Sequence, residues 1–184
     1  MEETKQIRLC GFGGQGIILG GKILGHASIG AGKHVAGLSS YGGAVRGGVC
    51  ESDIIVSDEM ITFPQVIVAD ILIAMSQGAY DKHIGNVNKK GGLVIYDKQS
   101  VSPKEVDDLK QIGIPATEIA VRELNNKQVA NIILLGAAVE ITKIIGKHDL
   151  TTAIEKGVRE RFRELNLKAV ELGFKKGREA AGKV

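Results

Sequence analysis

The chain has 184 residues, of which 43% are hydrophobic and 24% charged, so it can bury one sizeable core and we expect a single domain. Its formal net charge of +3 is too small to indicate a nucleic-acid partner, and no apolar run reaches the roughly 20 residues of a membrane-spanning helix. Residues 1–6 are polar and do not resemble a signal peptide, so we expect a cytoplasmic protein without nucleic-acid or membrane partners.

A glycine-rich turn follows the first predicted strand, residues 7–10, and opens a helix predicted over residues 15–30. It reads Gly11-Phe12-Gly13-Gly14-Gln15-Gly16, a pattern that presents backbone amides to a phosphate. A dinucleotide-binding enzyme places an acidic residue about 20 residues further on. Here the next acid is Glu51, so the turn indicates an α/β protein and argues against NAD.

The rest of the chain alternates β-rich and helical segments, and further strands are predicted over residues 34–38, 49–57, 70–75 and 92–97. Pro64 is predicted to open a short helical turn, and Ser76 to cap a helix. Gly20, Gly21 and Gly25 indicate close packing of the first helix. These segments predict a Rossmann-like, doubly wound, mostly parallel sheet with helices on both faces.

The last third of the chain is predicted to be helical. Residues 127–145 are apolar nearly all round, which indicates a buried helix. A terminal amphipathic helix is expected to bury one stripe made of Phe162, Leu165, Ala169 and Leu172.

The sequence contains no self-contained catalytic or metal-binding pattern. The four histidines share no ligand spacing with one another or with Cys10 and Cys50, and two cysteines cannot build an iron–sulfur cluster. Residues 16–22 match a P-loop up to Lys22, but Ile23 stands where Ser or Thr would bind magnesium. We therefore expect neither a catalytic residue nor a metal site in this chain alone.

Several segments, in this order and spacing, carry a family resemblance over nearly the whole chain. They are Gly11 to Gly16, Ser40-Tyr41-Gly42 with Arg46-Gly47-Gly48, Pro64 with residues 70–74, Ala130-Asn131 with Leu135-Gly136-Ala137, and Asn166-Leu167-Lys168-Ala169 with Gly173. With them the chain resembles the gamma subunit of the 2-oxoacid:ferredoxin oxidoreductases, most closely the 2-oxoglutarate type. The resemblance implies one gamma-type domain over residues 1–184.

The resemblance also implies cofactors and partners. The family oxidatively decarboxylates a 2-oxoacid on thiamine diphosphate, passes electrons through iron–sulfur clusters to ferredoxin, and forms an acyl-CoA. Thiamine diphosphate, magnesium and the clusters are then expected in alpha, beta and, where present, ferredoxin-like delta subunits, with coenzyme A as a shared ligand.

Site residues follow from the same resemblance. Candidates for binding coenzyme A phosphates are Gly11, Gly13, Gly14, Gln15, Gly16 and Lys22. Candidates for an active-site or subunit-interface loop are Ser40, Tyr41, Arg46, Gly47 and Gly48. Asn131, in an apolar helix, is expected to belong to a structural hydrogen-bond network.

Alternatives stay open at this point. Lys22 is equally well explained as a solvated residue, and Arg46 as a contact to an acid of a sister subunit. Gly43-Ala44-Val45 replace the Pro-Glu-Met that commonly precedes Arg-Gly-Gly in the family, which leaves the acid substrate undecided. The chain could instead be a purely structural assembly subunit, or a stand-alone nucleotide-binding module.

Overall fold

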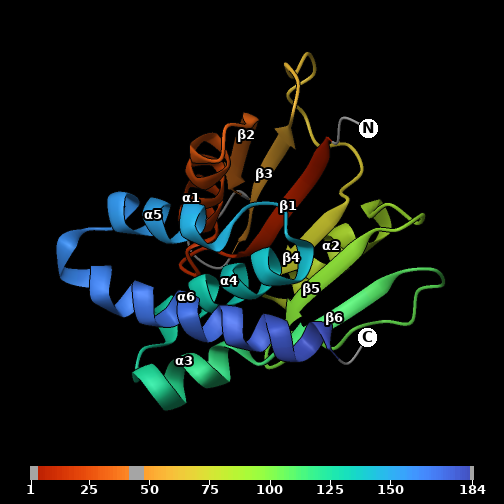
Figure 1. Cartoon of the computed structure of the whole chain (residues 1–184). Coiled ribbons are helices and arrows are strands. Elements are labelled where there is room, and N and C mark those ends of the chain that lie inside the picture. The colour runs from red at the N-terminus through yellow and green to blue at the C-terminus, as the bar shows by residue number, and fades with distance from the viewer. Residues whose placement is uncertain (1–3, 42–47, 183–184) are drawn as a thin grey trace.

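The computed structural model describes residues 4–41 and 48–182, so Arg46, Gly47 and residues 43–45 lie outside the described residues. A six-stranded sheet forms its centre (Figure 1). In chain order the strands are β1 (Lys5–Phe12), β2 (His34–Tyr41), β3 (Val49–Ser57), β4 (Ile71–Ala74), β5 (Leu93–Asp97) and β6 (Lys110–Ile114), and in space β2-β3-β1-β4-β5-β6.

Most strands of this sheet run in one direction. β1, β4, β5 and β6 pair in parallel. β3 lies antiparallel to both β1 and β2, so β2 points the same way as β1. The prediction of a mostly parallel sheet is confirmed, with β3 as the one reversed strand of the described sheet.

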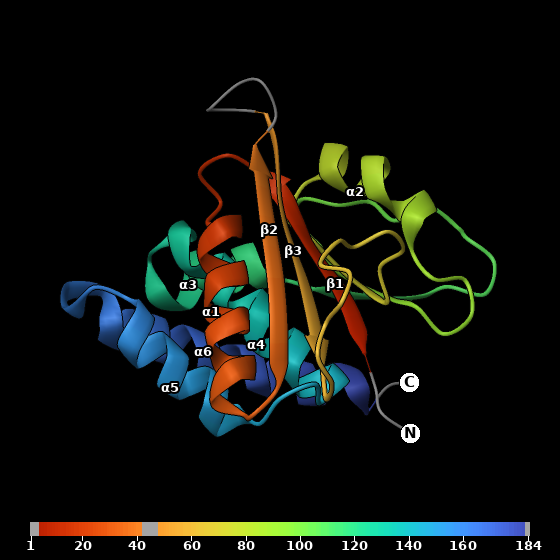
Figure 2. The ribbon, with the colours of Figure 1, turned by 90° about the horizontal axis from the view of Figure 1, so that it is seen from above.

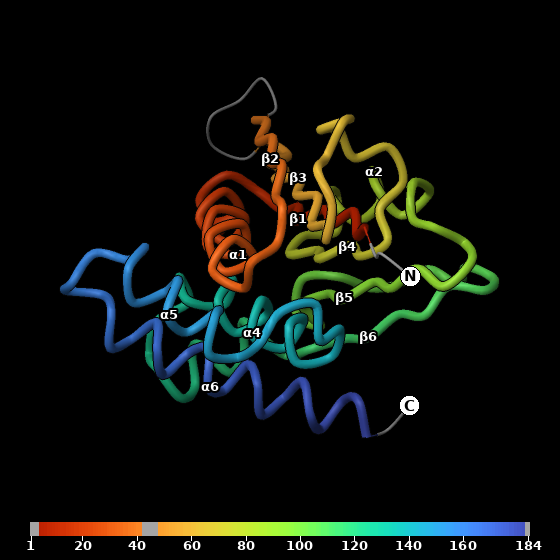
Figure 3. The backbone as a smooth tube through the Cα atoms, turned by 45° about the horizontal axis from the view of Figure 1, so that its top comes forward, coloured from red at the N-terminus to blue at the C-terminus, as the bar shows by residue number. Residues whose placement is uncertain are grey.

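Helices cover both faces of the sheet, but unequally. Figure 2 shows α1 (Ile17–Gly30), α3 (Ala116–Leu124), α4 (Ala130–Thr142), α5 (Lys147–Gly157) and α6 (Glu160–Ala181) on one side, with α2 (Gln77–His83) on the other. Figure 3 shows α6 outside α4, so this side is two helices deep. Within residues 4–41 and 48–182, no helix is both long and apolar enough to cross a membrane.

Side chains alternate between the two faces along each strand. On β1, Ile7 and Leu9 join the core beneath the five helices, while Cys10 joins the smaller core beneath α2. All four residues of β4 are buried, because both of its faces are covered. The apolar run predicted at residues 70–75 therefore reflects a central strand.

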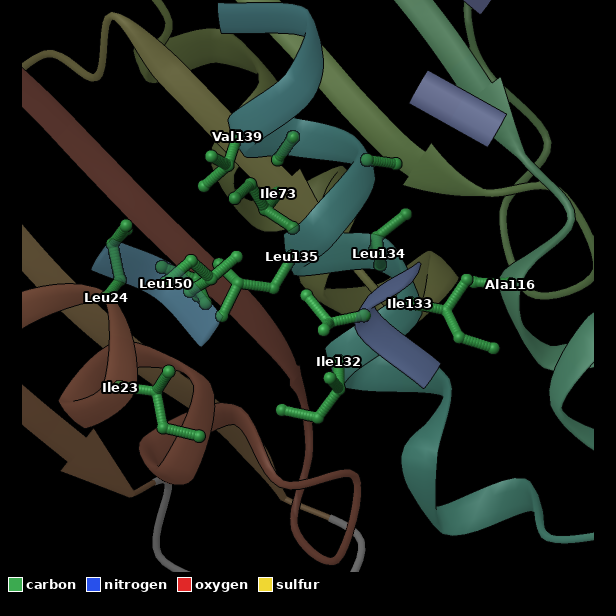
Figure 4. Close-up of a cluster of buried hydrophobic side chains, with 14 of the residues drawn as sticks. Ile23, Leu24, Ile73, Ala116, Ile132, Ile133, Leu134, Leu135, Val139 and Leu150 are labelled. Atoms are coloured by element: carbon green, nitrogen blue, oxygen red, sulfur yellow. The ribbon is translucent and has the colours of Figure 1, made fainter. Parts of the chain in front are cut away.

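Helix α4 lies at the centre of the larger core. Figure 4 shows Ile132, Ile133, Leu134 and Leu135 pointing away from this helix in different directions, with Leu135 toward Leu150 of α5 and Ile133 toward Ala116 of α3. All four side chains are fully buried. The prediction of a helix buried nearly all round is confirmed.

Helix α6 packs on α4 through glycines rather than through the predicted apolar stripe. A Cβ added at Gly177 would lie 2.7 Å from Glu140 Cβ and 2.8 Å from Ala137 O, and one at Gly173 would overlap Ile133 O. Only Ala169 of the predicted stripe is fully buried, whereas Phe162 is 39% exposed. The stripe prediction was wrong at Phe162 because glycines bring the two helix backbones together along another line.

Gly21 of α1 and the segment around Pro64 were also predicted from the sequence. Gly21 packs closely, as predicted, since an added Cβ would overlap the Ser52 side chain of β3. The helical turn expected at Pro64 is wrong: residues 58–70 form an irregular connection in which Val66 and Ala69 cover Ile55 of the sheet. Burial of these two side chains, rather than a helical period, shapes this segment.

Candidate functional site

One edge of the sheet brings the predicted site segments together. β1 ends there, and α1 and α2 begin there, as the upper end of Figure 2 shows. β4 ends beside β1, because Ala74 is paired with Cys10 in the parallel register. Met75 N donates to Cys10 O at 2.9 Å, which joins the ends of β1 and β4. Gly13 N donates to Gly48 O at 3.2 Å, which joins the turn of residues 11–16 to the start of β3. We call this region the glycine edge.

Two glycines of the turn adopt a backbone conformation that other residues rarely adopt. Gly14 has φ of +98° and Gly16 has φ of +73°. A Cβ at Gly16 would overlap the Asn131 amide, whereas one at Gly14 would meet no atom within 4 Å. Gly16 therefore fits a crowded position, and Gly14 leaves the backbone open to a ligand.

The turn leads directly into the N-terminus of α1. The first amides of a helix lack intrahelical acceptors and carry partial positive charge. Gly16 is the N-cap residue, it provides no side-chain cap, and the first turn of α1 contains no acidic residue. Together with the open backbone at Gly14, this arrangement suits an anion.

The side chain of Gln15 binds backbone groups in and next to the turn. Its Oε1 accepts from Phe12 N at 2.6 Å, and its Nε2 donates to Met75 O at 2.8 Å. Asn131 supports the same turn from α4, because its Nδ2 donates to Gly16 O at 3.0 Å. Both side chains thus stabilise the conformation of the loop. The three side-chain atoms that make these hydrogen bonds are used within the turn and do not face a ligand.

The other predicted residues lie at varied distances from the turn. Lys22 is exposed on α1, and within the described residues its ammonium makes no ion pair. Tyr41 ends β2 and is 63% exposed. Ser40 Oγ donates to Glu51 Oε1 at 2.7 Å across the β2–β3 pair. The structure therefore joins Ser40 and Gly48 to the glycine edge, while Lys22 stays on the helix surface.

A buried charge network lies on the α2 face of the sheet, next to this edge. Arg8 is paired with Asp53 in the β1–β3 register and binds it with two hydrogen bonds, Nε to Oδ1 at 2.7 Å and Nη2 to Oδ2 at 2.6 Å. Nη2 also donates to Val66 O at 3.1 Å. Nη1 lies 3.4 Å from His83 Nδ1, and His83 Nε2 lies 2.7 Å from Glu51 Oε2.

These contacts determine which nitrogen of His83 carries the proton. A guanidinium can only donate, so the Nδ1 atom that faces Arg8 must accept. The proton of a neutral His83 is then on Nε2, which lies close to Glu51 Oε2 but forms no hydrogen bond among the described residues. Protonation of Nδ1 would place two donors and two positive charges against each other.

The pKa shifts in the network favour a neutral His83. Burial lowers the pKa of His83 below its ordinary 6.5, and this outweighs the opposite effect of Glu51. Burial raises the pKa of Glu51, but the hydrogen bond from Ser40 and the nearby His83 and Lys82 bring it below its ordinary value. The hydrogen bond to Asp53 raises the pKa of Arg8.

Sequence reasoning did not identify this network, although one signal was present. Arg8 is a charged residue inside an otherwise apolar strand, and Asp53 interrupts another strand. Buried charges are nearly always paired, so each required a partner. The partners became evident only from the register of β1 and β3.

Cys10 and Cys50 are both buried. Burial raises the pKa of Cys10 to about 12 and also raises that of Cys50, so both thiols are unreactive at neutral pH. In the described part of the chain, no three His, Cys, Asp or Glu side chains gather as a metal site would require.

The chain is similar to known proteins over nearly its whole length. The family model for pyruvate ferredoxin/flavodoxin oxidoreductase matches residues 6–176. The chain is 43% identical over 180 residues to the 2-oxoglutarate synthase subunit KorC of Methanocaldococcus jannaschii, which covers 96% of this chain and 94% of the relative. It is 30% identical to the ketoisovalerate oxidoreductase subunit VorA of Methanothermobacter marburgensis over 91% of this chain but only 35% of VorA.

Solved structures share the fold. The gamma subunit of a keto/oxoacid ferredoxin oxidoreductase from Geobacter sulfurreducens superimposes with a TM-score of 0.84 at 34% identity, covering 96% of this chain and 99% of that subunit. A 2-oxoglutarate:ferredoxin oxidoreductase from Magnetococcus marinus, with 2-oxoglutarate, coenzyme A and succinyl-CoA bound, gives a TM-score of 0.83 at 23% identity. The match covers 99% of this chain and 32% of that one.

Proposed function

Because the chain belongs to the pyruvate ferredoxin/flavodoxin oxidoreductase family, we propose that it is the gamma subunit of a multi-subunit oxidoreductase that converts 2-oxoglutarate and coenzyme A to succinyl-CoA and carbon dioxide, with reduction of ferredoxin. Its similarity to 2-oxoglutarate synthase subunits extends over nearly the full length of both chains and exceeds its similarity to the ketoisovalerate subunit. That difference in similarity supports 2-oxoglutarate as the 2-oxoacid substrate of the complex.

In this proposal, the sister subunits carry the cofactors and the catalytic groups of the reaction. Across the described residues, the side chains at the glycine edge include no activated nucleophile and no metal cluster. Alpha and beta subunits would hold thiamine diphosphate, magnesium and iron–sulfur clusters, and a ferredoxin-like delta subunit could carry further clusters. A cytoplasmic location is part of this proposal and can be tested by cell fractionation and immunoblotting.

The role proposed for this chain is to bind the phosphates of coenzyme A at the glycine edge. The observation that carries the proposal is the open backbone at Gly14, followed directly by an α1 N-terminus without an acidic residue. Coenzyme A carries several phosphate charges, which backbone amides and the helix dipole can stabilise. Gln15 and Asn131 would keep this turn in its binding shape.

The Gly14→Ala variant of the complete enzyme tests this role. A methyl group at Gly14 would occupy the open side of the turn and disturb a backbone that has φ of +98°. We expect KM for coenzyme A to rise about tenfold, equivalent to about 1.4 kcal/mol, in anaerobic viologen reduction. Turnover at saturating coenzyme A should change little.

Gly91→Ala is the matched control. Gly91 has φ of +92° and also meets no atom within 4 Å of an added Cβ, but it lies between α2 and β5, away from the glycine edge. It should show the same backbone strain and an unchanged KM for coenzyme A. If Gly14→Ala only reduces the amount of chain in the complex, the purely structural role is correct instead.

A further inference from the structure

Strand β2 forms one edge of the described sheet, and six of its eight residues are exposed. It pairs with β3 over eight consecutive residues, from His34 with Ser57 to Tyr41 with Cys50. Within residues 4–41 and 48–182, no strand lies on its other side. None of its eight residues is buried. The outer backbone amides and carbonyls of β2 are therefore available for pairing.

This edge lacks the features that normally prevent strands from pairing. Exposed edges are commonly protected by Lys, Pro, a bulge or a short length. β2 reads His-Val-Ala-Gly-Leu-Ser-Ser-Tyr, has an unbroken register with β3, and is eight residues long. The opposite edge, β6, is only five residues long, begins with Lys110 and buries Ile112 and Ile114. Of the two edge strands of the described sheet, β2 is thus the longer and the more exposed.

Large apolar side chains are exposed toward one end of β2. Leu38 is 56% exposed, Tyr41 is 63% exposed, and Phe12, at the end of β1, is 39% exposed. In the register of the sheet, Tyr41 faces Cys50 and Phe12 faces Val49, so both lie at the glycine edge. The free outer edge of β2 and the exposed side chains of Tyr41 and Phe12 therefore both reach the region where the proposed ligand binds.

We propose that an extended segment of a sister subunit pairs with the outer edge of β2 and covers Leu38. This inference rests on the proposed function, because it names the surface through which the glycine edge meets the chain that supplies the chemistry. Pairing of an added strand with an exposed sheet edge is an established mode of protein recognition. The main-chain hydrogen bonds would give affinity, and Leu38 would give specificity.

A sister subunit is favoured over a second copy of this chain. The homologous segment of VorA makes up only 35% of that chain, so the corresponding domain there is covalently joined to other polypeptide. A two-fold antiparallel pair of β2 strands would instead direct the two glycine edges to opposite ends of the joined sheet. Neither site would then receive a sister subunit through this strand.

Amide hydrogen exchange compares the native complex, purified through a tag on this chain, with the isolated chain. We expect the peptide containing residues 34–41 to exchange at least tenfold more slowly in the complex. Residues 116–124 of α3 serve as an internal reference. Complex formation without protection of β2 would overturn the docking proposal and leave the proposed function intact. Slowing in the isolated chain at high concentration would assign the edge to a second copy.

A pair of substitutions tests the same surface by affinity. Leu38→Lys places a charge on the edge, and Val121→Lys makes a similar change at an α3 side chain that is 50% exposed. We expect Leu38→Lys to weaken retention of the chain in the complex about tenfold, and Val121→Lys to leave it unchanged. Equal retention of both variants would overturn the proposal. If wild-type chain captures no sister subunit at all, the proposed function fails first, and this inference with it.

Discussion

Replacement of Gly173 by alanine should destabilise the fold, although the same change in a solvent-exposed helix would stabilise it. Gly173 lies inside α6 where that helix crosses α4. An added methyl group would overlap Ile133 O and would lie 3.1 Å from both Ala137 N and Gly136 Cα. All three neighbouring atoms belong to the backbone, so no side chain can rotate away and the helices must separate.

The expected magnitude combines two opposing effects. Overpacking of a core typically lowers the free energy of unfolding by about 1–3 kcal/mol. Because the neighbouring atoms here belong to rigid backbone, we expect a cost at the upper end of this range, about 3 kcal/mol. Alanine in a helix interior is about 1 kcal/mol more favourable than glycine. The net loss in free energy of unfolding is about 2 kcal/mol, equivalent to a Tm about 4–8 °C lower for a chain of this size.

Urea unfolding followed by circular dichroism at 222 nm measures this difference. The control is Gly30→Ala, at the end of α1, where an added Cβ meets no atom within 4 Å. Gly30→Ala should leave the midpoint unchanged or raise it slightly. A Gly173→Ala chain with a midpoint equal to or above that of wild type would refute the reasoning about close helix packing.

Three further predictions concern buried ionisable groups. Arg8→Met leaves Asp53 without its partner and should lower the free energy of unfolding by about 3–5 kcal/mol, whereas the double variant with Asp53→Leu should recover much of this loss in the same urea assay. The folded-state pKa of His83 is lowered, so below about pH 6.5 the unfolded chain binds a proton that the folded chain does not, and stability should fall as the pH drops through this window. His83→Gln should flatten that part of the stability profile, and an unchanged slope would assign it to other groups. Cys10, with a pKa of about 12, should not react with an aromatic disulfide reagent at pH 8 until the chain is unfolded in urea, and rapid labelling of Cys10 in the native chain would contradict this.

Much of the fold was evident from local patterns in the sequence. β3 was predicted with its observed bounds, Val49–Ser57, because its alternation is regular, and the buried character of α4 followed from its composition. The reversed direction of β3 was not predicted, since strand alternation carries no information on direction. The stripe predicted for α6 was wrong only at Phe162, and the closest contacts of the helix were not predicted because they involve Gly173 and Gly177, which apolar periodicity does not count.

The place of the glycine turn was predictable, but its side-chain contacts were not. The glycine pattern located the turn before α1, because glycine tolerates the positive φ found at Gly14 and Gly16. That Gln15 turns inward to Met75 depends on where β4 ends, which a one-dimensional pattern does not contain. The pairing of Arg8 with Asp53 likewise depends on strand register, so only the need for a partner was visible.

The position of β3 between β1 and β2 has a consequence for synthesis of the chain. Among the described strands, β2 has only β3 as a hydrogen-bonding neighbour, and the earliest neighbour of β1 along the chain is also β3. A nascent chain that ends before Val49 can form α1, but it can form none of the strand pairs of the described sheet. Sheet formation on the ribosome should therefore wait until β3 has emerged, and fragments that end before β3 should remain substrates for chaperones and proteases.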